Sequence, residues 1–285
     1  MRIATTIFLT DETISPVRLA RELEQRGFAG LFLPQHTHIP VSRATPAPMG
    51  EPLPREYGRC LDPFLALAQA AAVTHRIGIG TGVTLVAQQD PIVLAKQVAT
   101  LDFLSGGRFT FGIGHGWNVE EAADHGVEWR TRRRLVRDRM ALMRALWAKE
   151  PTAYEGEFGS VQESWAFPKP VHPPRERKDA EPLLGPRTLL GGSPGPRLFA
   201  EIAEFGDGWL PIGGGGLRES VPALRRAWEE AGRPGEPVVV PYAVHPSAEK
   251  LAHLADQGIE EVVVGLPSAG EAEVLRALDA HAEFL

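Results

Sequence analysis

Residues 78–121 read GIGTGVTLVAQQDPIVLAKQVATLDFLSGGRFTFGIGHGWNVEE. Two short runs rich in β-branched and aromatic residues, Ile77–Val86 and Arg108–Ile113, flank a helical pattern at Pro91–Leu104. Asp90 predicts the start of that helix, because an aspartate caps a helix and the following proline fits its first position. The Ser-Gly-Gly after the last helical residue predicts its end, because glycine permits the left-handed exit. We therefore expect a strand, a helix and a strand in succession.

The same alternation of strand-like and helical segments runs through all 285 residues. The eight strand candidates are Ile3–Leu9, Gly30–Pro34, Ile77–Val86, Arg108–Ile113, Thr188–Gly191, Gly208–Ile212, Val238–Val244 and Glu261–Leu266. The helical candidates are Val17–Gln25, Pro63–Val73, Pro91–Leu104, Arg132–Trp147, Pro196–Phe205, Ser220–Ala231, Ala248–Asp256 and Glu271–Phe284. Eight strands alternating with helices predict an α/β fold, a (β/α)8 TIM barrel that forms a single domain over residues 1–285.

Two longer connections interrupt this alternation. Thr37–Arg59 is rich in proline and follows the second strand, so it belongs to the carboxyl-terminal face of a barrel, where active sites are built. We expect it to form a lid. Pro151–Arg187 precedes the fifth strand and contains a hairpin pattern, TAYEGEFGSV. Within it, the charged stretch 175–186 has no role that the sequence identifies.

Composition narrows the class of protein. The chain is 43% hydrophobic and 23% charged, with a net charge of −6 and no basic patch, so we expect no nucleic-acid partner. The first ten residues, MRIATTIFLT, are too short and polar for a signal peptide or a membrane span. A lone cysteine, Cys60, indicates a reducing compartment and excludes a cysteine-based metal cluster. We expect a cytoplasmic protein with no membrane partner.

The glycines of FGIGHGWNVEE, residues 111–121, suggest a dinucleotide-binding loop at first sight. That fingerprint needs glycines at relative positions one, three and six after the first strand of a doubly wound sheet. Counting from Gly112, the sixth position is Trp117, and counting from Gly114 it is Val119. Either side chain blocks the close approach of helix and strand, so the dinucleotide interpretation fails. What remains is either a strand end that admits a flat ligand ring or an ordinary tight turn.

Several motifs together resemble one known family. They are LFLPQHTHIP (31–40), the 78–121 stretch, LLGGSP (189–194) and FGDGWLP (205–211). This pattern is similar to the luciferase-like monooxygenase superfamily, a group of barrels that use flavin or the deazaflavin coenzyme F420. It is closest to the F420-dependent branch, in which a histidine follows strand two and a Gly-Trp-Asn triplet follows strand four. The resemblance covers most of the chain.

The resemblance implies a set of site residues. His36 matches the catalytic histidine beside the redox ring. Thr81, Gly82 and Val83 match a strand-three bulge with a non-proline cis peptide that supports one face of the ring. The cofactor contacts after strands four and five match Gly114, Gly116, Trp117, Asn118, Gly191, Gly192 and Ser193, of which the last three correspond to a phosphate cradle.

Other residues have competing interpretations. Phe8, His38 and His115 are candidates for the substrate pocket, although Phe8 also fits core packing and His38 also fits a plain loop. His36 and His38 form an H-x-H pair that could bind a metal, but the predicted strand ends offer no further ligands, so we expect no metal. Gln35 and Trp117 stand where some relatives have acidic residues, which argues against a sugar-phosphate substrate.

The function implied by the resemblance is an F420-dependent oxidoreductase. Hydride would pass between the deazaflavin C5 and a small organic substrate, while His36 holds or moves the accompanying proton. An FMN-dependent monooxygenase, supplied with reduced flavin by a separate reductase, is the alternative within the fold. A metal-dependent hydrolase or a cofactor-binding barrel without turnover represents other classes. The family further implies a homodimer.

Overall fold

The computed structural model describes residues 1–178 and 180–285. Its main sheet has nine strands among these residues, and every pairing within it is parallel. Their order is β12 (Val238–Val239), β11 (Gly208–Leu210), β10 (Arg187–Gly191), β5 (Phe109–Gly114), β3 (Gly78–Thr81), β2 (Gly30–Leu33), β1 (Arg2–Thr6) and β13 (Glu261–Gly265), with the short β4 (Thr84–Leu85) also on β5.

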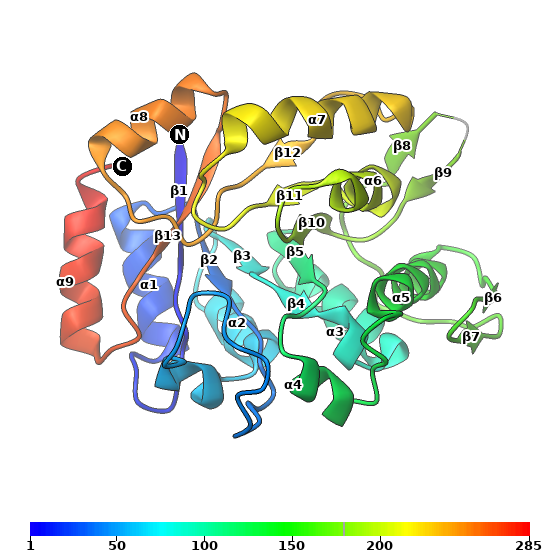
Figure 1. Ribbon diagram of the computed structural model, residues 1–285, viewed down its shortest axis with the longest axis horizontal. Coiled ribbons are helices and arrows are strands. Elements are labelled where there is room, and N and C mark those ends of the chain that lie inside the picture. The colour runs from blue at the N-terminus through cyan, green and yellow to red at the C-terminus, as the bar shows by residue number, and fades with distance from the viewer. Residues whose placement is uncertain (179) are drawn as a thin grey trace.

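The sheet curves until its two ends meet (Figure 1). The chain that follows β12 lies against β13: Val263 donates its backbone N–H to Pro241 at 2.8 Å, and Val244 donates to Val263 at 3.0 Å. Gly265 donates back to Val244 at 3.1 Å. These bonds close the ring, and the predicted barrel fold is confirmed.

Helices surround the barrel on the outside (Figure 1). They are α1 (Pro16–Arg26), α2 (Pro63–Ala72), α3 (Pro91–Leu104), α4 (Val119–Asp124), α5 (Arg132–Trp147), α6 (Pro196–Phe205), α7 (Leu217–Glu230), α8 (Ala248–Asp256) and α9 (Glu271–Ala282). Four of them, α3, α5, α6 and α8, have the predicted bounds, and Asp90 caps α3 by accepting from the backbone of Ile92 and Val93. None of the described helices is long and apolar enough to cross a membrane.

The helical candidates did not include α4 or the short 3-10 helices η1 (Arg55–Arg59) and η2 (Val86–Gln88). These elements lie in the connections at the carboxyl-terminal ends of strands.

Two apolar cores hold the layers together. Inside the barrel, the inward-facing side chains of alternate strand residues pack around Phe32 and Tyr242. The larger core lies between the strands and the outer helices and includes the predicted α5 stripe of Val136, Met140, Met143 and Trp147, all buried.

The Pro151–Arg187 connection contains two antiparallel hairpins. The predicted one pairs β6 (Tyr154–Glu155) with β7 (Ser160–Val161). The second pairs β8 (Arg175–Arg177) with β9 (Ala180–Leu183) and includes the described residues 175–178 and 180–183 of the charged stretch 175–186, whose role the sequence does not identify.

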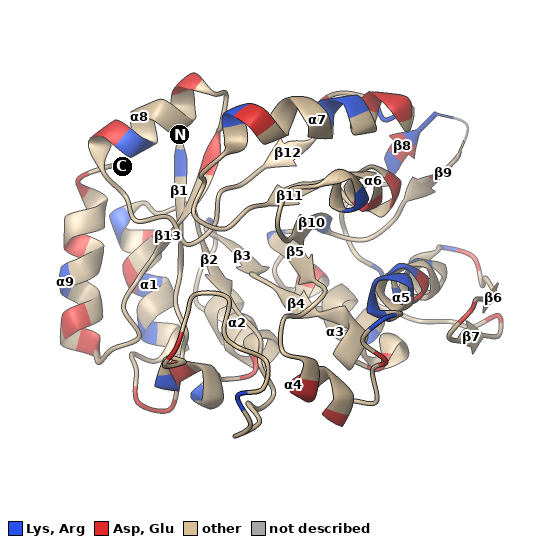
Figure 2. Cartoon of the chain, viewed as in Figure 1, with Lys and Arg blue, Asp and Glu red and all other residues tan. Residues whose placement is uncertain are grey.

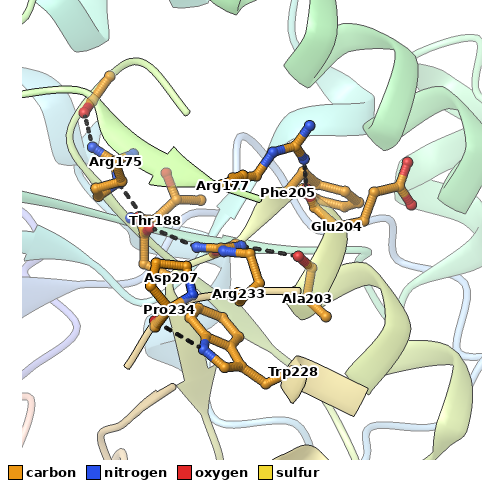
Figure 3. Close-up of polar contacts among 12 residues, drawn as sticks. Arg175, Arg177, Thr188, Ala203, Glu204, Phe205, Asp207, Trp228, Arg233 and Pro234 are labelled. Carbon is orange, nitrogen blue, oxygen red and sulfur yellow. Dashed lines mark hydrogen bonds and ion pairs between the residues drawn. The ribbon is translucent and has the colours of Figure 1, made fainter. Parts of the chain in front are cut away.

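Arginines anchor this second hairpin to the amino-terminal face of the barrel (Figure 3). Arg175 donates from Nε to Asp207 at 2.8 Å, and Arg177 donates from Nη1 to the carbonyl of Glu204 at 2.7 Å. Arg233, stacked on the Trp228 ring, donates to the carbonyls of Ala203 and Gly206. The carbonyls at the end of α6 therefore receive guanidinium groups, which suits the negative end of a helix dipole.

Asp207 contacts two arginines, Arg175 and Arg233, among the residues drawn in Figure 3. Its second oxygen also accepts from the backbone of Thr188 at 2.7 Å.

Because Asp207 is buried, we expect Asp207→Ala to lower the free energy of unfolding by about 3 kcal/mol, measured by urea denaturation. The control Glu157→Ala removes an exposed partner of Arg134 and should cost less than about 1 kcal/mol. Equal losses in the two variants would contradict this role.

Candidate active site

A buried pair of side chains lies at the carboxyl end of the barrel. His36 follows β2, and its Nδ1 lies 2.9 and 3.0 Å from the two carboxylate oxygens of Glu121 in α4. Only 7% of the His36 side chain and 1% of the Glu121 side chain is exposed. An ionised carboxylate can only accept a hydrogen bond, so Nδ1 donates and Nε2 is the nitrogen available to a bound molecule.

The predicted Gly-Trp-Asn triplet builds the turn that places Glu121. Gly116 adopts a φ of 74°, which favours glycine, and Asn118 then caps α4 by accepting from the Glu121 backbone at 3.1 Å. Glu121 was not among the residues predicted from the sequence. The signal was present, because an asparagine followed three residues later by a glutamate is typical of a helix start.

Aromatic rings enclose the pair. The His36 ring lies 5.9 Å from the Trp117 ring and 5.4 Å from the Tyr57 ring, and Tyr57 in turn lies 4.4 Å from Phe8. Tyr57 belongs to η1, so the Thr37–Arg59 connection contributes a wall of the site. Burial raises the pKa of Tyr57 to about 12, which keeps its phenol neutral at physiological pH. Tyr57 was not among the predicted site residues.

The predicted bulge follows β3, and the peptide bond between Gly82 and Val83 is cis, as the resemblance implied. The Tyr242 ring occupies the space that a Cβ on Gly82 would need. Val83 fills the corresponding space at Gly114 and Gly191. These two glycines therefore make room for the bulge itself, a packing role that the sequence did not reveal.

Two polar side chains fasten the bulge to the barrel. Thr81 is fully buried and donates its hydroxyl to the Gly112 carbonyl at 2.7 Å. Gln35 is also buried and accepts from the backbone of Leu85 at 2.9 Å. Gln35, at the position where the resemblance implies an acidic residue in some relatives, thus has a structural partner.

The predicted phosphate cradle lies at the end of β10. Gly192 and Ser193 are exposed, and α6 begins three residues beyond Ser193. The neighbouring α7 begins after Gly216, and in the described part of the chain neither helix receives a side-chain cap. Two helix amino termini with unbonded N–H groups can accept an anionic group. The role of Gly191, Gly192 and Ser193 in binding stays a prediction.

The two other candidate histidines contact carboxylates other than Glu121. His38 is 42% exposed at the rim, where its Nε2 lies 3.0 Å from Asp124. His115 contacts Glu201 of α6 at 3.2 Å, beside Arg133, which binds the same carboxylate. Burial acts to raise the pKa of Glu201, but the contacts with His115 and Arg133 outweigh it and lower that pKa. A substrate-pocket role for His38 or His115 stays a prediction that this geometry does not favour.

No group of three or more His, Cys, Asp or Glu side chains within residues 1–178 and 180–285 has the arrangement of a metal site. His36 and His38 in particular have different partners, Glu121 and Asp124.

The sequence and the fold place the chain in a known family. The sequence model of the luciferase-like monooxygenase family matches residues 13–283, so the chain belongs to that family. An uncharacterised protein of Mycobacterium tuberculosis is 41% identical over 271 residues, covering 94% of this chain and 92% of that protein. The F420-dependent glucose-6-phosphate dehydrogenase of Kineococcus radiotolerans is 33% identical over 174 residues, covering 59% of this chain and 48% of that enzyme.

Solved structures share the fold at low identity. An F420-dependent secondary alcohol dehydrogenase in complex with an F420–acetone adduct has a TM-score of 0.75 at 16% identity and covers 100% of this chain and 98% of that one. The oxygenating constituent of 3,6-diketocamphane monooxygenase from Pseudomonas putida, in complex with FMN, has a TM-score of 0.63 at 18% identity. It covers 85% of this chain and 66% of that chain. The resemblance found in the sequence is confirmed.

Proposed function

We propose that the chain is an F420-dependent oxidoreductase in which His36 accepts and returns the proton that accompanies hydride transfer. The buried contact between His36 and Glu121 is the observation that carries this proposal. The curated F420-dependent relative and the F420-dependent structural neighbour support the choice of cofactor.

The residues present fit such a cofactor. Asn118 is 1% exposed, and its side-chain nitrogen is buried without a hydrogen-bond partner among the described residues, so it is free to donate to a ring substituent. The Gly82–Val83 bulge would support one face of the ring, with Trp117 near its edge. The uncapped starts of α6 and α7 would receive the phosphate group.

When bound, the deazaflavin would supply hydride transfer at C5, chemistry that no protein side chain provides. The accompanying proton is transferred by a side chain of the protein. Glu121 fixes the imidazole ring of His36 through Nδ1, so that Nε2 can accept a proton from a substrate hydroxyl or return it to a carbonyl. The carboxylate also stabilises the imidazolium that forms when Nε2 accepts the proton. Phe8, Tyr57 and Trp117 limit the access of water to this nitrogen.

An FMN-dependent monooxygenase, supplied with reduced flavin by a separate reductase, is the second candidate. The fold shared with the FMN-bound monooxygenase supports it. In that case the same bulge and the same helix starts would hold the flavin.

Variants of the buried pair test the proposed function. His36→Ala should lower the turnover of F420 reduction with a secondary alcohol at least ~100-fold, because a positioned acid–base group contributes 10²–10⁴-fold. Its affinity for F420, measured by fluorescence titration, should change less than about threefold, because the proton-transfer group is not a main binding contact.

Glu121→Gln tests the other member of the pair, and Glu120→Gln is its matched control. Both remove one carboxylate from the first turn of α4, but only Glu121 contacts His36, whereas Glu120 accepts from the Thr45 backbone. Glu121→Gln should lower kcat and shift the pH at which the rate falls, and Glu120→Gln should leave both near the values of the unmodified chain. A normal rate and pH profile in Glu121→Gln would remove the pair from the mechanism.

We also propose that the protein is a homodimer that associates through α2 and α3. Figure 2 shows charged residues along α5, α7, α8 and α9, whereas α2 has none and α3 has only Lys96 and the buried Asp102. Large apolar side chains are exposed on this side of the chain: Leu65, Ile92, Val93, Phe103, Leu104, Trp165 and Phe167. A neutral apolar face can pair with the same face of a second copy, which is the geometry of a two-fold dimer.

Light scattering after size-exclusion chromatography tests this association. The unmodified chain should have twice the 31.0 kDa mass of one copy. Val93→Glu introduces a charge into the face and should give a monomer, whereas Val41→Glu, at an exposed position in the Thr37–Arg59 connection, should not. A monomeric unmodified chain, or a dimer that tolerates Val93→Glu together with Leu104→Glu, would refute the proposed interface.

A further inference from the structure

A cavity lies at the opposite end of the barrel from His36. Its volume is about 330 Å³, and residues at the amino ends of β1, β2, β3, β5, β10 and β13 line it. It exists because two neighbouring strands have glycine at inward-facing positions of this layer, Gly30 and Gly78, which pair with each other. Phe32, two residues along β2, faces the same way and closes the inner end.

The wall of this cavity is strongly basic. Four arginines line it, Arg2, Arg76, Arg108 and Arg187, and Glu261 is the one carboxylate among the described lining residues. The excess of positive charge is notable in a chain whose net charge is −6. A cavity lined by charges of one sign concentrates ions of the opposite sign.

Two of these arginines are held by the barrel itself. Arg187 donates to Glu261 at 3.1 Å and to Thr110 at 2.9 Å. The Arg108 guanidinium donates to the hydroxyl of Thr74 and to nearby backbone carbonyls, such as that of Ile77 at 2.8 Å. Both are fixed charges that need no further ligand to be ordered.

The other two arginines keep donors available. Arg2 has 64% of its side chain exposed, and among residues 1–178 and 180–285 its side-chain partner is Glu261, which contacts Nη2. Arg76 donates from Nη2 to the carbonyl of Glu24, whose carboxylate is occupied by backbone N–H groups of residues 75–77. The remaining nitrogens of Arg2 and Arg76 can bind an incoming carboxylate, for which the guanidinium fork is well suited.

We propose that this cavity is a binding site for a small organic anion. The carboxylate of the ligand binds Arg2 and Arg76 at the rim, and its apolar body points inward to Phe32. A volume of about 330 Å³ corresponds to roughly ten water-sized groups, since one water occupies about 30 Å³. The site is separate from the proposed oxidoreductase site and needs no cofactor.

Calorimetric titration with benzoate at constant ionic strength tests the proposal, with neutral benzamide as the control ligand. Benzoate should bind saturably with one site per chain, and benzamide should bind at least tenfold more weakly. The double variant Arg2→Gln/Arg76→Gln should weaken benzoate binding at least tenfold. Arg226→Gln, which removes an exposed charge on α7, should leave it unchanged.

A cavity-filling variant supplies an independent readout. A Cβ on Gly78 would lie 3.5 Å from its nearest neighbour, an ordinary contact, so Gly78→Val should fold and occupy the cavity. It should abolish benzoate binding while the far-ultraviolet circular dichroism stays unchanged. Saturable binding that survives both Gly78→Val and the double arginine variant would overturn the proposal, as would equal binding of benzamide or no binding of benzoate to the unmodified chain.

Discussion

The carboxylate of Glu121 and the imidazole of His36 meet across the mouth of the barrel, and both are almost completely buried. Burial of a carboxylate is costly unless hydrogen bonds offset it, so the surrounding structure must hold the pair together. The strands before them, β2 and β5, are separated by β3, so the connections must span that gap. The Asn118 cap directs α4 inward, and Tyr57 packs over the His36 ring.

Local features were predictable from the sequence because their signals lie close together along the chain. The Asp90 cap and the apolar stripe of Arg132–Trp147 define two helices to the residue. The contact of His36 with Glu121 joins residues 85 apart, and the bond of Arg175 to Asp207 joins residues 32 apart. Such contacts depend on where the barrel brings the strand ends, which no single stretch of sequence contains.

The glycines show why residue type alone leaves a role open. Gly114 is a predicted cofactor contact, and in the structure Val83 packs where a side chain at this position would be. Gly30 and Gly78, which the sequence did not single out, leave a cavity at the other end of the barrel. In each case the glycine has no side chain, and the surrounding structure determines whether other protein atoms occupy the space, as Val83 does at Gly114, or a cavity remains. The two ends of the barrel consequently differ, with a buried histidine–glutamate pair at one and excess arginine at the other.

Binding of a deazaflavin beside His36 is the property on which the proposed function depends. Parallel fluorescence titrations of the purified protein with F420 and with FMN measure it. We expect saturable binding of F420, with FMN bound at least tenfold more weakly, and weaker F420 binding in Asn118→Ala because the buried side-chain nitrogen of Asn118 is lost. Tighter binding of FMN, or no binding of either cofactor, would contradict it.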